Sequence, residues 1–225
     1  MHMEKTRRLT VSALMIAIAA TLAIVCALIP FLNLPFGGGF TIASMLPLVV
    51  IAYMYGTKWG LFSSFVYALL QISLDLMLGA RGSTIMALFL PQSDDFMGYA
   101  AAVWILILDY LVAYTVLGLG GILRNRIKSK TLALCLGAVI ALSLRYLVHI
   151  ISGYIFYGAW AEWFFSQEGF TLGAAMLDLF SGKILAVVYS VVYNGLYMIP
   201  EIVITACAAV IVSRLPQVRK IDTVQ

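Results

Sequence analysis

The sequence predicts an all-α integral membrane protein, a single domain of six transmembrane helices over residues 1–225. Composition is the first observation behind this prediction: 63% of the residues are hydrophobic and 11% are charged. The second is that the apolar residues form long runs, which are typical of membrane-spanning helices. The third is that the basic residues gather in short clusters between those runs, as they do on the cytoplasmic face of membrane proteins.

The charge clusters also predict the topology. If the N-terminus is inside, one face of the lipid membrane receives most of the basic residues, while the other receives Arg81, with Lys183 at a border. By the positive-inside rule, both termini should then be cytoplasmic. The net charge of +4 therefore gives no reason to expect a nucleic-acid partner. The basic residues of the predicted inner face are Lys5, Arg7, Arg8, Lys58, Arg124, Arg126, Lys128, Lys130, Arg214, Arg219 and Lys220.

The predicted spans begin with a long one and a short one. Because the first run is long and similar runs follow it, we expect a span there rather than a cleavable signal peptide. Its Ala13 and Ala17 form a small-xxx-small pattern that lets another helix pack closely, although alanine is common in membrane helices. The glycines and proline of residues 31–40 predict a loop before the short second span. The six spans are residues 9–30, 41–56, 60–78, 97–123, 131–157 and 183–212.

The connections between the later spans differ in character. Residues 79–96 combine glycine, proline and acids with a short apolar patch, which predicts a loop with room for an interfacial turn. A basic loop at 124–130 follows the fourth span. Residues 158–182 carry aromatic and acidic side chains, so we expect an interfacial connection there, with a short amphipathic helix near the sequence AAMLDLF.

Five ionisable residues fall inside the predicted spans: Asp75, Asp109, Arg145, His149 and Glu201. Such residues are expensive in a bilayer and usually face a protein interior or a cavity. Asp75 lies near the outer end of its span, where it could simply reach the interface. For Arg145 and Glu201 we expect a structural ion pair, because a lone buried arginine would be costly.

One helix face in the fifth span is open to two interpretations. His149, Gly153 and Tyr157 recur every fourth residue and therefore share that face. A titratable ring and an aromatic ring with a glycine between them fit the wall of a ligand pocket. They fit a helix–helix contact equally well, since polar side chains also occur where membrane helices pack.

Neighbouring spans supply groups that favour the pocket. Asp109 lies beside Tyr110 in the fourth span, and the sixth span carries Tyr189 and Asn194. Together with His149, this set offers a carboxylate, an imidazole, an amide and aromatic faces, which suit a small flat heterocycle, particularly a cation. The set has no nucleophile–base–orienter spacing, so we expect no enzymatic activity. The sequence also has no metal-ligand spacing and no Walker A sequence, so we expect no cofactor, and any ATP-driven work should fall to another polypeptide.

Several segments, in the same order over nearly the whole chain, resemble the substrate-binding S component of energy-coupling factor vitamin transporters, specifically the thiamine-specific branch. Each segment alone is weakly diagnostic, but together they are quite specific. They are residues 37–47 (GGGFTIASMLP), 58–61 (KWGL), 108–113 (LDYLVA), 144–146 (LRY) with His149 and Ser152-Gly153, 189–195 (YSVVYNG) and 197–201 (YMIPE).

The resemblance implies a six-helix bundle in a prokaryotic cell membrane that binds thiamine from outside. It also implies a complex with a transmembrane coupling protein and two cytoplasmic ATPases. The family's ligand-contacting residues match Asp109, His149, Tyr189 and Asn194, with Tyr110 as a further candidate. A stacking residue eight positions after the histidine, which can be tryptophan in relatives, is Tyr157. The family's small-residue motif, which meets the coupling protein, matches Ala13 and Ala17.

The sequence departs from the family in its first loop. Some relatives have a tryptophan and a glutamate there and at the start of the second span, whereas this chain is glycine-rich and has neither. Residues 37–39 have the freedom that a lid over the ligand needs. Other interpretations remain: the same fold could bind a thiamine precursor or another vitamin, or a standalone carrier could use Asp109 and His149 as a proton relay.

Overall fold

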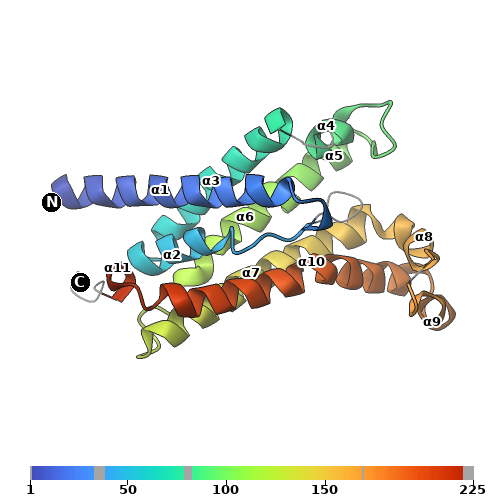
Figure 1. Ribbon diagram of the computed structural model, residues 1–225. Coiled ribbons are helices and arrows are strands. Elements are labelled where there is room, and N and C mark those ends of the chain that lie inside the picture. The colour runs from blue at the N-terminus through green and yellow to red at the C-terminus, as the bar shows by residue number, and fades with distance from the viewer. Residues whose placement is uncertain (1, 33–38, 79–82, 169, 220–225) are drawn as a thin grey trace.

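The computed structural model describes residues 2–32, 39–78, 83–168 and 170–219. Four long helices run along the molecule (Figure 1): α1 (His2–Ala27), α3 (Thr57–Leu78), α7 (Lys130–Phe156) and α10 (Gly182–Val212). The fourth predicted span is a succession of α5 (Tyr99–Ile105), η3 (Leu106–Val112), α6 (Ala113–Thr115) and η4 (Val116–Gly121). The shorter elements are η1 (Pro30–Leu32), α2 (Leu46–Tyr55), α4 (Thr84–Phe89), η5 (Gly158–Trp160), α8 (Ala161–Phe165), α9 (Gly173–Leu179) and α11 (Pro216–Arg219).

Five helical segments of the described chain, rather than the six expected, are long and apolar enough to cross a membrane. The exception is the second expected span, at 41–56, which contains only the ten-residue helix α2. A helix of that length covers about 15 Å, half of the roughly 30 Å of a bilayer core. The predicted short helix near AAMLDLF is confirmed by α9. Part of the stretch expected as a loop at 79–96 is the helix α4.

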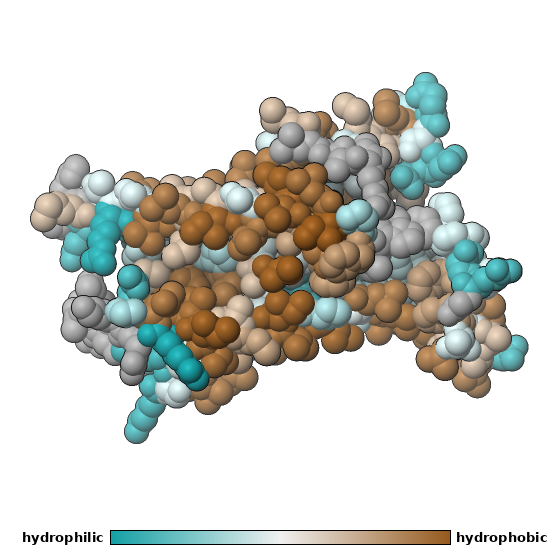
Figure 2. Space-filling view, in the orientation of Figure 1, coloured by the Kyte–Doolittle hydropathy of each residue, from teal (hydrophilic) through white to brown (hydrophobic). Residues whose placement is uncertain are grey.

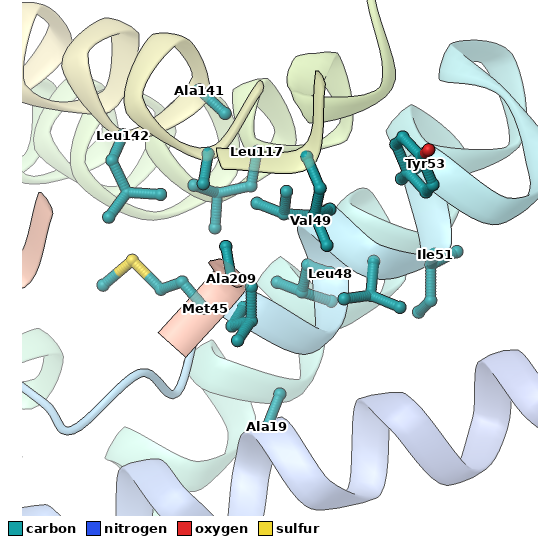
Figure 3. Packing of buried hydrophobic residues seen from close by; sticks show 14 of the residues in the cluster. Ala19, Met45, Leu48, Val49, Ile51, Tyr53, Leu117, Ala141, Leu142 and Ala209 are labelled. Carbon is teal, nitrogen blue, oxygen red and sulfur yellow. The ribbon is translucent and has the colours of Figure 1, made fainter. Parts of the chain in front are cut away.

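The short helix α2 is the centre of the hydrophobic core. Eight of its ten residues are buried, and its sequence LPLVVIAYMY is apolar on every face, as expected for a helix surrounded by protein. Figure 3 shows Leu48 and Val49 of α2 lying between Ala19 of α1 and Leu117 of η4. Because neighbouring helices cover α2, it does not present a face to lipid as the five long segments do.

Two contacts with α1 define the path of the chain around α2. The backbone N–H of Ile42 donates to Cys26 Sγ near the end of α1, at 3.3 Å. Trp59 Nε1 donates to Ser12 Oγ near the start of α1, at 2.9 Å. The chain therefore runs back along α1 between residues 42 and 59, over the roughly 21 Å that separate Ser12 from Cys26 on a helix.

This return path, counted from residue 39 to residue 59, begins with a segment that is not helical, residues 39–45. Backbone groups without helical partners need other acceptors in a membrane protein's interior. Glu201, which is 1% exposed, supplies one: its Oε2 accepts from Thr41 N at 2.5 Å, and Thr41 Oγ1 donates to the same carboxylate at 2.9 Å. The expected ion pair between Arg145 and Glu201 is wrong, because in the described structure the glutamate carboxylate binds Thr41 instead.

The two ends of the molecule are hydrophilic and the middle is apolar. The start of α1, α11 and the basic connection after η4 lie at one end, with α8 and α9 at the other (Figure 1). Figure 2 shows hydrophobic side chains across the middle of the visible face, with hydrophilic ones toward both ends. Ala13 and Ala17 are both exposed on α1. Apart from Gly39, the predicted lid at 37–39 lies outside the described residues.

Candidate functional site

A cavity of about 200 Å³ lies among the helices toward the α8 end of α7 and α10. All six residues predicted to bind ligand line it, so the structure brings together side chains from the fourth, fifth and sixth predicted spans. Nine further residues complete the wall. The predicted six are Asp109, Tyr110, His149, Tyr157, Tyr189 and Asn194, and the others are Gly39, Thr84, Leu88, Ile105, Tyr114, Arg145, Gly153, Tyr193 and Tyr197.

Asp109 and Tyr110 belong to η3, a π-helical stretch inside the fourth predicted span. A π-turn contains more residues than an α-turn, so it shifts the side chains that follow it around the helix. Such stretches are rare and frequently mark functional sites. The sequence predicts a regular helix here, because its apolar run carries no signal for the wider turn.

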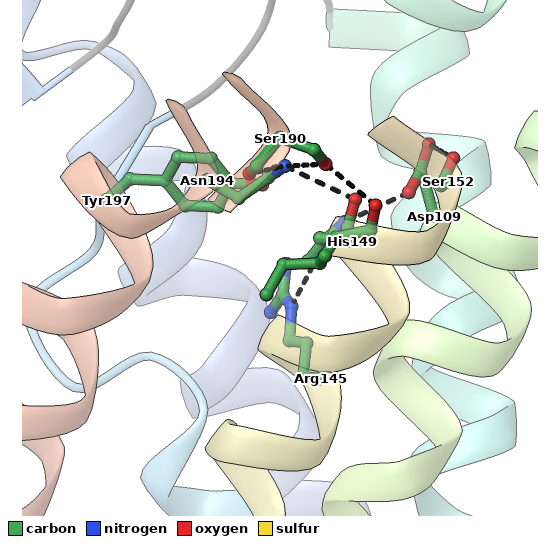
Figure 4. Close-up of polar contacts among 8 residues, drawn as sticks. Asp109, Arg145, His149, Ser152, Ser190, Asn194 and Tyr197 are labelled. Carbon is green, nitrogen blue, oxygen red and sulfur yellow. Dashed lines mark hydrogen bonds and ion pairs between the residues drawn. The ribbon is translucent and has the colours of Figure 1, made fainter. Parts of the chain in front are cut away.

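A chain of hydrogen bonds joins Asp109, His149 and Arg145 (Figure 4). Arg145 Nε donates to His149 Nε2 at 3.1 Å, and His149 Nδ1 lies 3.0 Å from Asp109 Oδ1. Because a guanidinium can only donate, Nε2 must be the acceptor, and Nδ1–H donates to the carboxylate. This arrangement describes a neutral imidazole that bridges a cation and an anion. Ser152 Oγ donates to the second carboxylate oxygen, Oδ2, at 2.8 Å.

Arg145 is part of the cavity wall and also holds its neighbours in place. Its side chain is 7% exposed, and its guanidinium carbon lies 4.2 Å from the centroid of the Tyr114 ring. Its Nη1 also donates to the sulfur of Met45, just before α2. The arginine therefore ties the return path of the chain to the His149–Asp109 pair.

Asn194 is held by neighbours on two helices. Its Nδ2 donates to the carbonyl oxygens of Ser190, at 2.8 Å, and of His149, at 3.2 Å. Its Oδ1 accepts from the Tyr197 hydroxyl. These bonds hold the amide at the cavity wall and leave one lone pair on Oδ1 for a further donor.

The face of the fifth span that carries Gly153 was open to two interpretations, a pocket wall or a helix–helix contact, and the structure shows both. A Cβ atom at this position would meet Ser190 Oγ and would lie 3.0 Å from Asn194 Nδ2. The glycine therefore allows α10 to approach α7 closely, and the same close approach brings Asn194 beside His149. The face is a helix–helix contact and a cavity wall at once.

Aromatic rings form one side of the cavity along α10. Tyr189 and Tyr193 are stacked, with ring centroids 5.7 Å apart, and Tyr197 packs edge-on against His149 at 5.9 Å. Phe164 of α8 packs against the end of the row that lies nearest α8, with its ring centroid 5.3 Å from that of Tyr189. The row of tyrosines on α10 therefore both packs against neighbouring rings and lines the cavity.

Several lining residues could not be predicted from the sequence, or were not, for identifiable reasons. Thr84 and Leu88 lie on α4, in a stretch whose glycines and acids predicted a loop. Gly39 belongs to the return path, where the backbone itself faces the cavity. Tyr114 lies four residues after Tyr110, and this helical spacing is a signal that could have identified it.

These groups give the cavity a defined chemistry. Asp109 offers carboxylate lone pairs beyond those that His149 and Ser152 use, and Asn194 Oδ1 offers another acceptor. The tyrosines supply π faces that attract flat rings and cations. The arrangement suits reversible binding of a small, flat, donor-rich molecule.

Comparison with known proteins agrees with this geometry. The sequence profile described as "Thiamine transporter protein" matches residues 13–166, more than half of the chain. The chain is also 29% identical over 208 residues to the thiamine transporter ThiT of Bacillus subtilis (strain 168), covering 88% of this chain and 86% of that protein. With its five long apolar segments, the chain is a multi-pass protein of a prokaryotic membrane. It belongs to the thiamine transporter protein family.

Proposed function

We propose that this chain binds thiamine in the cavity and mediates its uptake as the S component of an energy-coupling factor importer, with no catalysis of its own. The observation that carries the proposal is the convergence of Asp109, His149, Tyr189 and Asn194 on one cavity, in a member of the thiamine transporter family.

Thiamine has the chemistry that the cavity favours. It joins a cationic thiazolium ring to an aminopyrimidine, so it offers positive charge, an amino donor and two flat faces. Asp109 balances the charge or accepts from the amino group, and Asn194 Oδ1 accepts a second donor. Tyr157, Tyr189 and Tyr110 stack on or enclose the rings, where a cation gains further attraction from the π faces.

We further propose that the chain crosses the membrane six times, with both termini in the cytoplasm. The five long segments supply five crossings. Residues 42–59 run back along α1 and supply the sixth, through α2 and the non-helical residues before it. Such backbone is tolerated at membrane depth when it is buried in protein and its polar groups are bonded, as Thr41 is to Glu201. The positive-inside rule then puts the basic end in the cytoplasm.

The energy for uptake would come from partner proteins: a transmembrane coupling protein and two cytoplasmic ATPases. Ala13 and Ala17 are both exposed on α1, and small residues one helical turn apart let another helix approach closely. The coupling protein would pack on this face. Loading, closure and reorientation of the bundle would follow ligand capture from the outer side.

Calorimetric titration of the purified chain with thiamine, riboflavin and biotin tests the proposed ligand. Thiamine alone should give a saturable binding heat. A thiamine precursor that binds more tightly than thiamine would redirect the proposal, because Tyr157 offers a smaller stacking face than the tryptophan of some relatives. Uptake into liposomes that contain this chain without ATPases would contradict the ATP-coupled part and favour the proton relay.

A further inference from the structure

The helix α4 closes part of the cavity although it has few anchors of its own. It is six residues long and lies beside α5, near the end of α3 (Figure 1). Thr84 and Leu88 line the cavity. Of its side chains, Ile85 and Leu88 are buried, with 3% and 2% exposed, whereas Met86 is 51% exposed. A helix this short is not stable by itself, so its place depends on what holds it.

The first turn of α4 is held by an acid from another helix. Asp75, half-buried near the end of α3, accepts from Thr84 N at 2.9 Å and from Ile85 N at 3.2 Å. Ser83 caps the same turn, since its Oγ accepts from Met86 N at 3.0 Å. Together, Asp75 and Ser83 satisfy three N–H groups that a helix start leaves without partners.

Through these contacts with α4, Asp75 affects the cavity although it does not line it. Thr84, whose N–H binds the carboxylate, is itself a lining residue. Leu88, one turn later, packs with Ala102 and Ile105 of α5 and against Tyr157. A movement of the first turn would therefore shift one wall of the cavity, while the α7–α10 wall would stay in place.

We propose that Asp75 is a positioning residue for the ligand: by holding the first turn of α4, its carboxylate keeps that wall closed and slows ligand release. The inference rests on the proposed binding of thiamine. It replaces the simpler interpretation, that Asp75 only reaches the membrane interface, because an interfacial acid has no need to meet two consecutive backbone N–H groups.

The experiment compares thiamine dissociation from the full-length wild type and three variants by competition with excess unlabelled ligand. Asp75→Ala removes the acceptor, whereas Asp75→Asn keeps one oxygen that can accept from Thr84 N. Asp178→Asn is the matched control, since Asp178 is an exposed acid of α9 at the same end of the molecule. Hydrogen exchange without ligand is measured on the same four proteins. If Asp75→Ala is not monodisperse, the dissociation rate of Asp75→Asn is compared with that of Asp178→Asn instead.

Loss of the charged acceptor should raise the dissociation rate in Asp75→Ala about tenfold, with a smaller rise in Asp75→Asn and no change in Asp178→Asn. Amides 84–86 should exchange faster in Asp75→Ala while those of α10 keep wild-type protection. The inference is overturned if the dissociation rate matches the control, or if exchange rises equally across the chain, as a general loss of stability would cause. Failure of the wild type to bind thiamine would refute the proposed function instead, and the exchange of amides 84–86 would still report on α4.

Discussion

Replacing Glu201 by alanine should destabilise the protein, because this buried carboxylate holds the non-helical return path. Thr41 N would lose an acceptor that lies 2.5 Å away, at a position where Glu201 is 1% exposed and water is excluded. A buried N–H left without a partner costs about 1–3 kcal/mol. The Thr41 hydroxyl loses less, since Ser44 Oγ remains 2.5 Å from it.

Thermal unfolding in detergent measures this cost. For a chain of this size, about 2 kcal/mol corresponds to a fall of roughly 4–8 °C in the midpoint. Glu201→Gln is the matched control, because its amide oxygen can still accept from Thr41 N, and its midpoint should fall much less. An exposed acid of α8 changed in the same way, Glu162→Ala, should leave the midpoint unchanged. Equal midpoints for Glu201→Ala and Glu162→Ala would refute the role given to Glu201.

Four further predictions concern the cavity and the proposed partner interface on α1. Asn194→Ala and His149→Ala should each weaken thiamine binding about tenfold or more while the protein still folds, as calorimetry and size-exclusion chromatography would show; unchanged binding in both would remove them from the site. Gly153→Ala should weaken binding too, because its methyl group would push against Ser190 and Asn194; wild-type affinity would contradict the close approach of α7 and α10. Arg145→Lys should lower the midpoint of unfolding, since the lysine loses the Nε bond to His149 and much of the contact with Tyr114; an unchanged midpoint would argue against the buried hydrogen-bond chain. Ala17→Leu should prevent co-purification with a coupling protein without altering thiamine affinity, and intact assembly would move the interface elsewhere.

The sequence was sufficient to predict the helical class, five of the spans and six residues that the structure places around one cavity. Long apolar runs indicate helices that cross a lipid bilayer, and the few polar residues inside those runs are easily recognised as candidates for a site. The fold around α2 could not be predicted in this way. Hydropathy is equally high for a short helix buried in protein and for one facing lipid, so α2 resembled an ordinary span.

The sequence also could not predict which groups on different helices bind one another. The carboxylate of Glu201 could bind either a cation or a backbone N–H. It binds Thr41 because residues 39–45 bring the Thr41 N–H next to it. Arg145 instead donates to His149, one turn along its own helix, and to the sulfur of Met45. The π-helical turn at Asp109 and the holding of α4 by Asp75 depend on contacts between distant segments, which leave no periodic pattern in the chain.

Calorimetric titration of the wild-type chain and of the Asp109→Asn variant with thiamine is the most direct test of thiamine binding in the cavity. The carboxylate of Asp109 meets both His149 and the cavity, so replacing it by an amide removes the charge that balances a cationic ligand while nearly preserving its shape. We expect saturable thiamine binding to the wild type and an affinity about tenfold or more lower in the variant. Equal affinities in the two proteins, or no thiamine binding by the wild type, would contradict the proposed binding of thiamine beside Asp109.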